Sequence, residues 1–198
     1  MRYIPRVLPN NDDWSTRHSV LTTARRAAAL INALAADRPD PADIADVLRD
    51  YGEVDPIDLT DRDIAKMRAA ADLLRQVFAA EHADHAADTL NRLLQDHTGR
   101  LRLTSHGGST PWHPHLDLDD DAPWDEWLLA SSCMALAVLV WDRQCPPGRH
   151  CASPSCQNVF ICQGSGPERR YCSRRCATRE RVAAHRRSHS TEPSNGAK

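Results

Sequence analysis

Apolar residues recur at the three- and four-residue spacing of amphipathic helices through most of residues 1–142. After an irregular start, the first such stretch begins near Ser15 and predicts one long helix. Asp40 and Pro41 then follow the order of an N-cap and a first helical residue, and Gly52 is placed to end the short helix that they begin. The opening part of the chain therefore predicts two helices.

Two more helices are predicted before the helical pattern breaks. Thr60 is a suitable N-cap for the third helix. The apolar residues of this helix define one buried face, which consists of Ile64, Met67, Ala71, Leu74, Val77 and Phe78. The fourth helix covers roughly 84–97 and stops before Gly99.

Helical spacing then gives way to alternation. Around Gly107 and Gly108 the sequence predicts a β-hairpin with strands near 100–105 and 112–118. A long apolar segment follows at roughly 123–142. Its apolar residues would lie on all sides of a helix, so we expect it to be the central buried helix of a mostly α-helical N-terminal domain.

Four cysteines follow a short Pro-Gly linker, Gln144–Gly148. Cys151 and Cys156 form a C-x4-C pair, and Cys172 and Cys176 form a C-x3-C pair after an insert of fifteen residues. Two close pairs of thiolates separated by a short loop are typical of a tetrahedral site for one structural Zn²⁺. An iron–sulfur cluster is the alternative metal centre.

The cysteines predict a small treble-clef-like zinc finger. We expect a zinc knuckle at the first pair, then a β-hairpin carrying Val159 and Phe160, then the second pair on one face of a helix start. So small a module has too little core to fold without its metal. The expected organisation is a helical domain over residues 1–143, the finger over residues 147–189 and a disordered tail over residues 190–198.

Charge is distributed unevenly along the chain. Residues 143–198 hold eleven basic and three acidic residues, whereas residues 1–142 hold fourteen basic and twenty-four acidic residues. A basic segment beside a metal-stabilised helix favours binding to nucleic acid. On the predicted helix, Arg175, Arg179 and Arg186 share one face, and a second stripe holds Arg174, Arg181 and His185. The candidate nucleic-acid contacts are Arg169, Arg170, Arg174, Arg175, Arg179, Arg181, Arg186 and Arg187.

These residues resemble the CGNR zinc-finger family of predicted bacterial transcription regulators. That family has the same cysteine spacing, an Arg-Arg-Trp-Cys segment, and the Cys-Gly-Asn-Arg motif that names it. The matching segments here are Arg169–Cys172 and Cys176–Arg179, with Ala177 and Thr178 in place of glycine and asparagine. The family's N-terminal part is a mostly helical domain called ABATE, which residues 1–142 resemble in length and helical content.

The resemblance implies a DNA-binding transcriptional regulator whose N-terminal domain senses a ligand or dimerises. DNA is the expected partner, and a homodimer and a small-molecule effector are further candidates. The alternative is a zinc-dependent protein-interaction or RNA-binding module without DNA specificity.

No apolar run opens the sequence, and the most apolar stretch has fifteen residues where a membrane span needs about 20. We therefore expect a cytoplasmic protein without a membrane segment.

Three other cysteines are candidates for secondary roles. Cys162 lies in the loop of the finger and is a redox-sensitive thiol, a spare ligand or a bystander, and the bystander is the favoured interpretation. Cys145 is a second spare thiol. Cys133 lies on the long apolar helix, where a core position is expected.

Histidines and aspartates suggest two weaker sites. His82 and His85, together with His113 and His115, are candidates for a second metal site, although solvated histidines are the favoured interpretation. The acidic run Asp117–Asp121 could bind a cation. The favoured interpretation is that it supplies negative charge to a loop and to the N-terminus of the following helix.

We expect no enzymatic activity. No nucleophile elbow, phosphate loop or nucleotide fingerprint is present. A treble-clef nuclease would need a histidine base and a second metal shell, for which the sequence offers His150 and His185 without a clear constellation.

Overall fold

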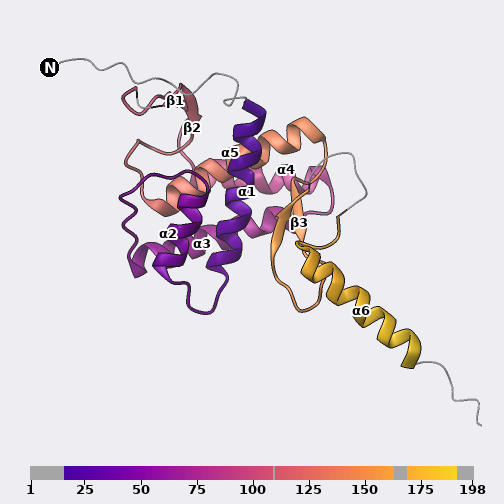
Figure 1. The fold of residues 1–198 in the computed structure, drawn as a ribbon. Helices are drawn as coiled ribbons and strands as arrows, with labels where there is room; N and C mark the ends of the chain where they lie inside the picture. Colours follow the sequence, from indigo (N-terminus) through magenta and orange to yellow (C-terminus); the bar gives the residue numbers. More distant parts are fainter. Residues whose placement is uncertain (1–15, 109, 163–168, 191–198) are drawn as a thin grey trace, which may run out of the picture.

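The computed structural model describes residues 16–108, 110–162 and 169–190. In these ranges the chain forms six helices and two small antiparallel strand pairs, which confirms the mostly α-helical prediction (Figure 1). The helices are α1 (Thr16–Leu34), α2 (Pro41–Asp50), α3 (Asp61–Phe78), α4 (Ala83–His97), α5 (Trp124–Arg143) and α6 (Arg174–Ser190). The predicted irregular start and the tail after Ser190 lie outside the described residues.

The predicted caps start two of these helices. The Asp40 side chain accepts a hydrogen bond from the backbone N–H of Ala42 at 2.9 Å, at the start of α2. Thr60 and Asp63 form a reciprocal capping box, in which each side chain accepts from the other residue's backbone N–H. These bonds satisfy N–H groups that have no partner inside the helix, so α2 and α3 begin where the sequence predicts.

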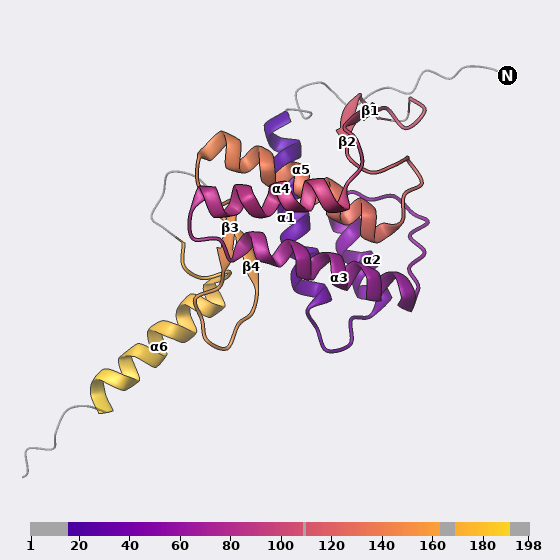
Figure 2. The same ribbon diagram turned by 180° about the vertical axis from the view of Figure 1, so that it is seen from behind.

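Helix α5 is the centre of the helical body, as predicted. It packs against α1, α3 and α4 (Figures 1 and 2). Its Leu128 and Leu136 side chains are fully buried. By length and composition it is the one helix in the described ranges that could cross a membrane. Its packing against three other helices accounts for this apolar character, because the core helix of a water-soluble protein has the same composition.

The first strand pair is shorter than the sequence predicts. Strands β1 (Arg102–Thr104) and β2 (His113–His115) pair antiparallel, with Leu103 opposite Pro114. The pairing ends after His115 because the Leu116 carbonyl turns to accept a hydrogen bond from the Gly99 N–H. The next side chain, Asp117, is only 3% exposed and points into the protein. The chain therefore leaves the strand to bury a carboxylate.

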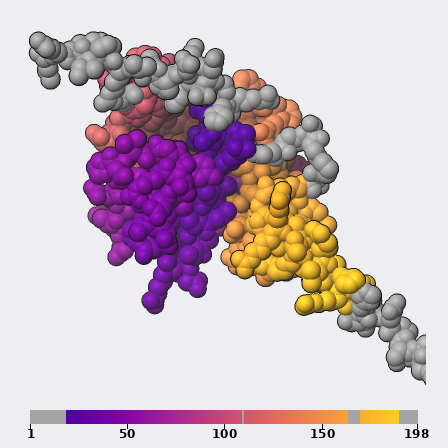
Figure 3. Space-filling model, viewed as in Figure 1, coloured from indigo at the N-terminus to yellow at the C-terminus, as the bar shows by residue number. Residues whose placement is uncertain are grey.

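The second strand pair attaches the cysteine-rich region to the helical body. Strands β3 (Gly148–His150) and β4 (Val159–Ile161) pair antiparallel and pack on α1 and α3, so that Val159 and Ile161 join the main core. Figure 3 shows this region, coloured orange to yellow, lying against the N-terminal helices. The predicted division between residues 1–143 and 147–189 stays a prediction.

Specific polar contacts and one close approach define this docking. The Asn32 side chain accepts from the Val159 N–H at 2.8 Å and donates to the Val159 carbonyl at 2.9 Å, so it pairs with β4 as a neighbouring strand would. Gly148 is required on β3, because an added Cβ would lie 2.4 Å from the Phe160 carbonyl oxygen and 2.6 Å from Cε1 of Phe78.

Candidate metal centre

The four predicted cysteines converge on one point. Their sulfur atoms all lie within 4.8 Å of one another. The Sγ atom of Cys172 lies 3.6 Å from that of Cys156 and 3.7 Å from that of Cys176. A tetrahedron of sulfurs about 2.3 Å from zinc has edges of about 3.8 Å. The four cysteines of a 2Fe–2S or 4Fe–4S cluster are divided among two or four iron atoms, so they do not all surround one point at these distances. The four thiols therefore fit one zinc ion.

The first cysteine pair lies in the turn between β3 and β4. Cys151 donates its N–H to the Asn158 carbonyl at 2.8 Å, and Cys156 donates to the Ser153 carbonyl at 2.9 Å. The knuckle is thus the tip of the hairpin and does not precede it. The predicted order is wrong on this point, because the first strand of the hairpin, Gly148–His150, begins at the last residue of the predicted linker and ends before Cys151.

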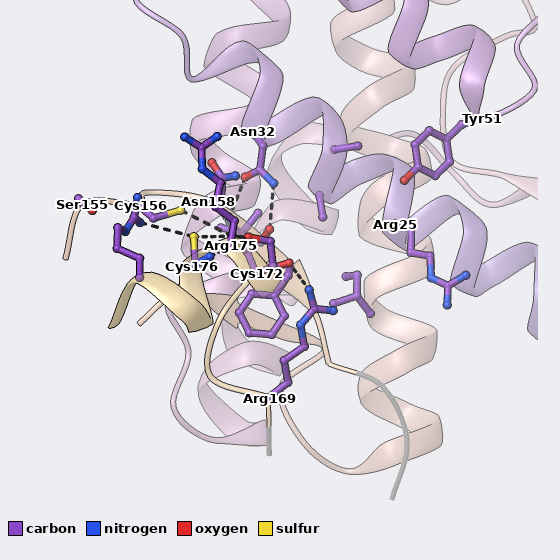
Figure 4. Close-up of a pocket in the computed structure, with 17 residues that line it drawn as sticks. Arg25, Asn32, Tyr51, Ser155, Cys156, Asn158, Arg169, Cys172, Arg175 and Cys176 are labelled. Carbon is purple, nitrogen blue, oxygen red and sulfur yellow. Dashed lines mark hydrogen bonds between the residues drawn. The ribbon is translucent and has the colours of Figure 1, made fainter. Parts of the chain in front are cut away.

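The second pair straddles the start of α6. Cys172 precedes the helix, Ser173 caps it by accepting from the Cys176 N–H at 3.2 Å, and Cys176 lies in its first turn. The prediction that both thiols lie on one helix face is wrong, because Cys172 is outside the helix. The cap turns the chain so that both thiols still point to the same centre (Figure 4).

Hydrogen bonds around the sulfurs stabilise thiolates. The backbone N–H of Cys172 lies 3.4 Å from the Cys151 sulfur, and Nη2 of Arg179 lies 3.5 Å from the Cys176 sulfur. Arg179 also donates to the Ser153 hydroxyl at 2.7 Å, and that hydroxyl donates to Glu180 at 2.5 Å. Sequence reasoning missed Ser153, which is 2% exposed and joins the knuckle to α6. Its position inside the C-x4-C pair was the available signal.

The thiols differ in acidity when no metal offsets their charge. The Ser173 hydroxyl lowers the pKa of Cys176 to about 7. Burial raises the pKa of Cys172 to about 12 and also raises the pKa of Cys156. Since zinc binds thiolates, the metal must displace the protons of these two thiols at neutral pH.

The predicted arginines fall into two groups. The first group makes contacts inside the finger: Arg169 donates to the Tyr171 and Cys172 carbonyls and lies over the Phe160 ring, and Arg179 contacts the zinc-site residues. Arg170 lies over the ring of Tyr171. The second group is exposed along α6 and consists of Arg174, Arg175, Arg181, Arg186 and Arg187.

An open groove of about 720 Å³ lies between the finger and α1, next to the place where they pack together (Figure 4). Arg25 and Asn32 line it on the α1 side, and Cys156, Cys172 and Cys176 line it on the finger side. Its remaining basic residues come from the finger: Arg169, Arg175 and Arg179. The groove is therefore basic and runs beside the metal site.

The other cysteines lie outside the metal centre. Cys133 is fully buried on α5, which confirms its core position, and burial raises its pKa to about 12. Cys145 is exposed, and Cys162 is half-buried at the end of β4. The interpretation of Cys162 as a bystander stays a prediction.

The predicted histidine groupings are only partly present. His82 and His85 are exposed, and neither they nor His150 and His185 join a potential metal cluster within the described ranges. His113 and His115 do belong to a cluster, whose third member is His106.

Comparison with known proteins agrees with the geometry. Residues 148–189 match the family model of the CGNR zinc finger. The match covers β3, the knuckle, β4 and nearly all of α6, and it leaves α1–α5 outside. No curated protein matches the chain. Residues 148–189 therefore form a finger of the CGNR zinc-finger family, as the resemblance of their motifs implies.

Proposed function

We propose that this protein, whose C-terminal region matches the CGNR zinc finger, is a DNA-binding transcriptional regulator in which the zinc-bound finger presents α6 to DNA. The observation that carries the proposal is the position of this helix. It begins at the metal site and extends beyond the helical body (Figures 1 and 3). With 17 residues it is about 25 Å long, and the major groove of B-DNA is wide enough for an α-helix.

The charge of α6 suits a polyanion. The helix contains six arginines and one glutamate, and that glutamate, Glu180, is bonded to Ser153 in the finger. At 100° per residue, Arg174 and Arg181 project from the side opposite Cys176. These two exposed arginines are therefore the most accessible to phosphates or base edges.

The acidic body supports a division of roles. Residues 1–142 carry a net excess of ten acidic groups, which would repel DNA from the body and favour approach along α6. The basic groove beside the zinc site gives a second place for phosphates, at Arg25 and Arg175. Ligand sensing or dimerisation by α1–α5 is part of the proposal for a regulator.

The proposal is tested by titrating a labelled duplex with the protein and with an Arg174→Ala/Arg181→Ala variant. We expect the variant to bind more weakly. The slope of log affinity against log salt concentration should be smaller in magnitude by about 2, because two phosphate contacts are lost. Neither arginine donates a hydrogen bond to a zinc-site sulfur, so zinc content should not change.

The matched control is Arg62→Ala/Arg68→Ala, which removes the same charge from exposed positions on α3. It should bind duplex as the wild type does. Equal binding by all three proteins would contradict a role for α6. Tighter binding to a single-stranded or hairpin RNA of equal charge would favour the RNA-binding alternative over DNA.

A further inference from the structure

Three histidines surround a single point on the β1–β2 hairpin. His113 and His115 are two residues apart on β2 and therefore share a face, and His106 follows β1 in the turn. The ring centroids lie 4.8–5.1 Å apart, and the rings are tilted or edge-on to one another. The arrangement thus directs ring edges inward and does not stack the rings.

The Nε2 atoms are the atoms that meet. Nε2 of His113 lies 3.0 Å from Nε2 of His115 and 3.3 Å from Nε2 of His106. Three nitrogens bound to one zinc at about 2.0–2.1 Å are separated by about 3.3 Å in a tetrahedral site. The two Nε2–Nε2 distances in the structure are therefore close to those of a zinc site.

The opposite ring nitrogens face oxygen acceptors. Nδ1 of His113 lies 2.8 Å from the Pro111 carbonyl oxygen, which can only accept, so Nδ1 carries the proton. Nδ1 of His115 lies 2.8 Å from both oxygens of Asp117, closer than Nη2 of Arg102 at 3.5 Å. Both neutral rings then direct Nε2 lone pairs at each other, and a shared cation resolves the repulsion between them.

Arg102 and two aspartates hold these imidazoles in place. Arg102 donates at 2.6 Å to Asp117 and at 2.6 Å to Asp120. Asp117 is buried beneath His115, and an Asp120 oxygen lies 3.5 Å from Nδ1 of His106. Carboxylates that orient metal-binding imidazoles in this way are common around metal sites. The acidic run, interpreted from sequence as loop charge, thus supplies the orienting groups.

The backbone of His106 gives an independent indication. Its φ is +47°, in the left-handed region that non-glycine residues seldom adopt. The Thr104 hydroxyl holds this turn by accepting from the His106 N–H at 3.0 Å. The strained turn brings the His106 ring against His113, which is the kind of cost that functional sites carry.

We propose that His106, His113 and His115 form a second metal site, which binds a divalent first-row transition-metal ion through three imidazole nitrogens. Imidazole ligands suit zinc, copper and nickel, and three protein ligands leave a coordination position open to solvent. The site lies at the opposite end of the body from α6 (Figures 1 and 2). It differs in chemistry from the four-thiolate finger and does not depend on the proposed DNA binding.

Zinc is the probe for this site, and the full chain with its finger already loaded is the material. Equilibrium dialysis should give two zinc ions per chain for the wild type and one for His113→Ala. The matched control is His85→Ala, an exposed histidine on α4, which should keep two. Asp117→Asn keeps all three ligands and should weaken zinc binding at this site by about 10–100-fold.

A second measurement uses only the wild-type protein, so it does not depend on whether the variants fold. Imidazole nitrogen resonances of the wild type should shift on zinc addition at His106, His113 and His115 together, and not at His82 or His85. One zinc per wild-type chain, with no histidine shift, would overturn the proposal and leave a proton shared between the rings as the explanation of their spacing. Two zinc ions in His113→Ala would overturn it as well.

Discussion

Arg179 and Arg174 lie on the same helix, yet their surroundings differ. Both side chains are exposed, but Arg179 also donates to the Cys176 sulfur and to Ser153, so it stabilises the zinc site. Sequence spacing assigns both to DNA contacts because helical periodicity shows which residues share a face but not what that face meets. An Arg179 substitution would therefore disturb the metal centre as well as any DNA contact.

The raised pKa values of two cysteine thiols predict that zinc binding becomes stronger as pH rises. The pKa of Cys172 is about 12 and that of Cys156 is raised, so both thiols are protonated at pH 7 and must lose protons to bind zinc. Acid favours the metal-free form, and alkali favours the bound form. Calorimetric titration in two buffers of different ionisation enthalpy should report release of at least two protons.

The Cys162→Ser variant is the control for this titration and should release the same number of protons. A binding heat that is the same in both buffers would contradict thiol ligation.

At the scale of elements, a few polar side chains attach the finger to the helical body. The Asn32 side chain on α1 hydrogen-bonds the backbone of β4 as a neighbouring strand would. Arg75 on α3 donates to the Gln157 carbonyl at 2.6 Å and to the Ile31 carbonyl at 3.1 Å. Arg143, the last residue of α5, donates to the Cys162 carbonyl. Three helices thus contact one hairpin through its backbone, which fixes the direction of α6.

Replacement of Asn32 by alanine should loosen this attachment. Two backbone groups of Val159 would lose their partners, at a cost of about 1–3 kcal/mol in the free energy of unfolding. Urea unfolding measures the loss, and faster hydrogen exchange at the Val159 amide locates it. Asn91→Ala, at an exposed position on α4, should change stability by less than about 0.5 kcal/mol. Equal effects of the two substitutions would contradict the docking role of Asn32.

The sequence predicted the elements better than their contacts. The caps at Asp40 and Thr60 and the buried face of α3 depend on neighbouring residues, and they are confirmed. The pairing of Asn32 with Val159 joins residues 127 positions apart, and no local pattern encodes it. His106 was missed for a related reason, because its left-handed turn is a departure from regular hairpin geometry.

At the scale of the whole molecule, the two ends of the body differ in chemistry. The finger with its arginine helix lies at one end, and the hairpin with its histidine cluster lies at the other (Figure 1). The convergence of the four cysteines on one zinc-sized point was predicted because their spacing follows from the coordination geometry. The arrangement makes the metal-dependent position of α6 the central claim of this account.

That claim is tested most directly by the affinity of one DNA duplex for Cys172→Ser and Cys162→Ser, measured by fluorescence anisotropy at a single salt concentration. Both variants exchange one finger thiol for a hydroxyl and keep every arginine, but only Cys172 is a predicted zinc ligand. We predict that Cys172→Ser loses most of its affinity, because α6 is no longer held at its start, whereas Cys162→Ser binds as the wild type does. Equal affinity of the two variants would contradict the claim that zinc positions this helix for DNA.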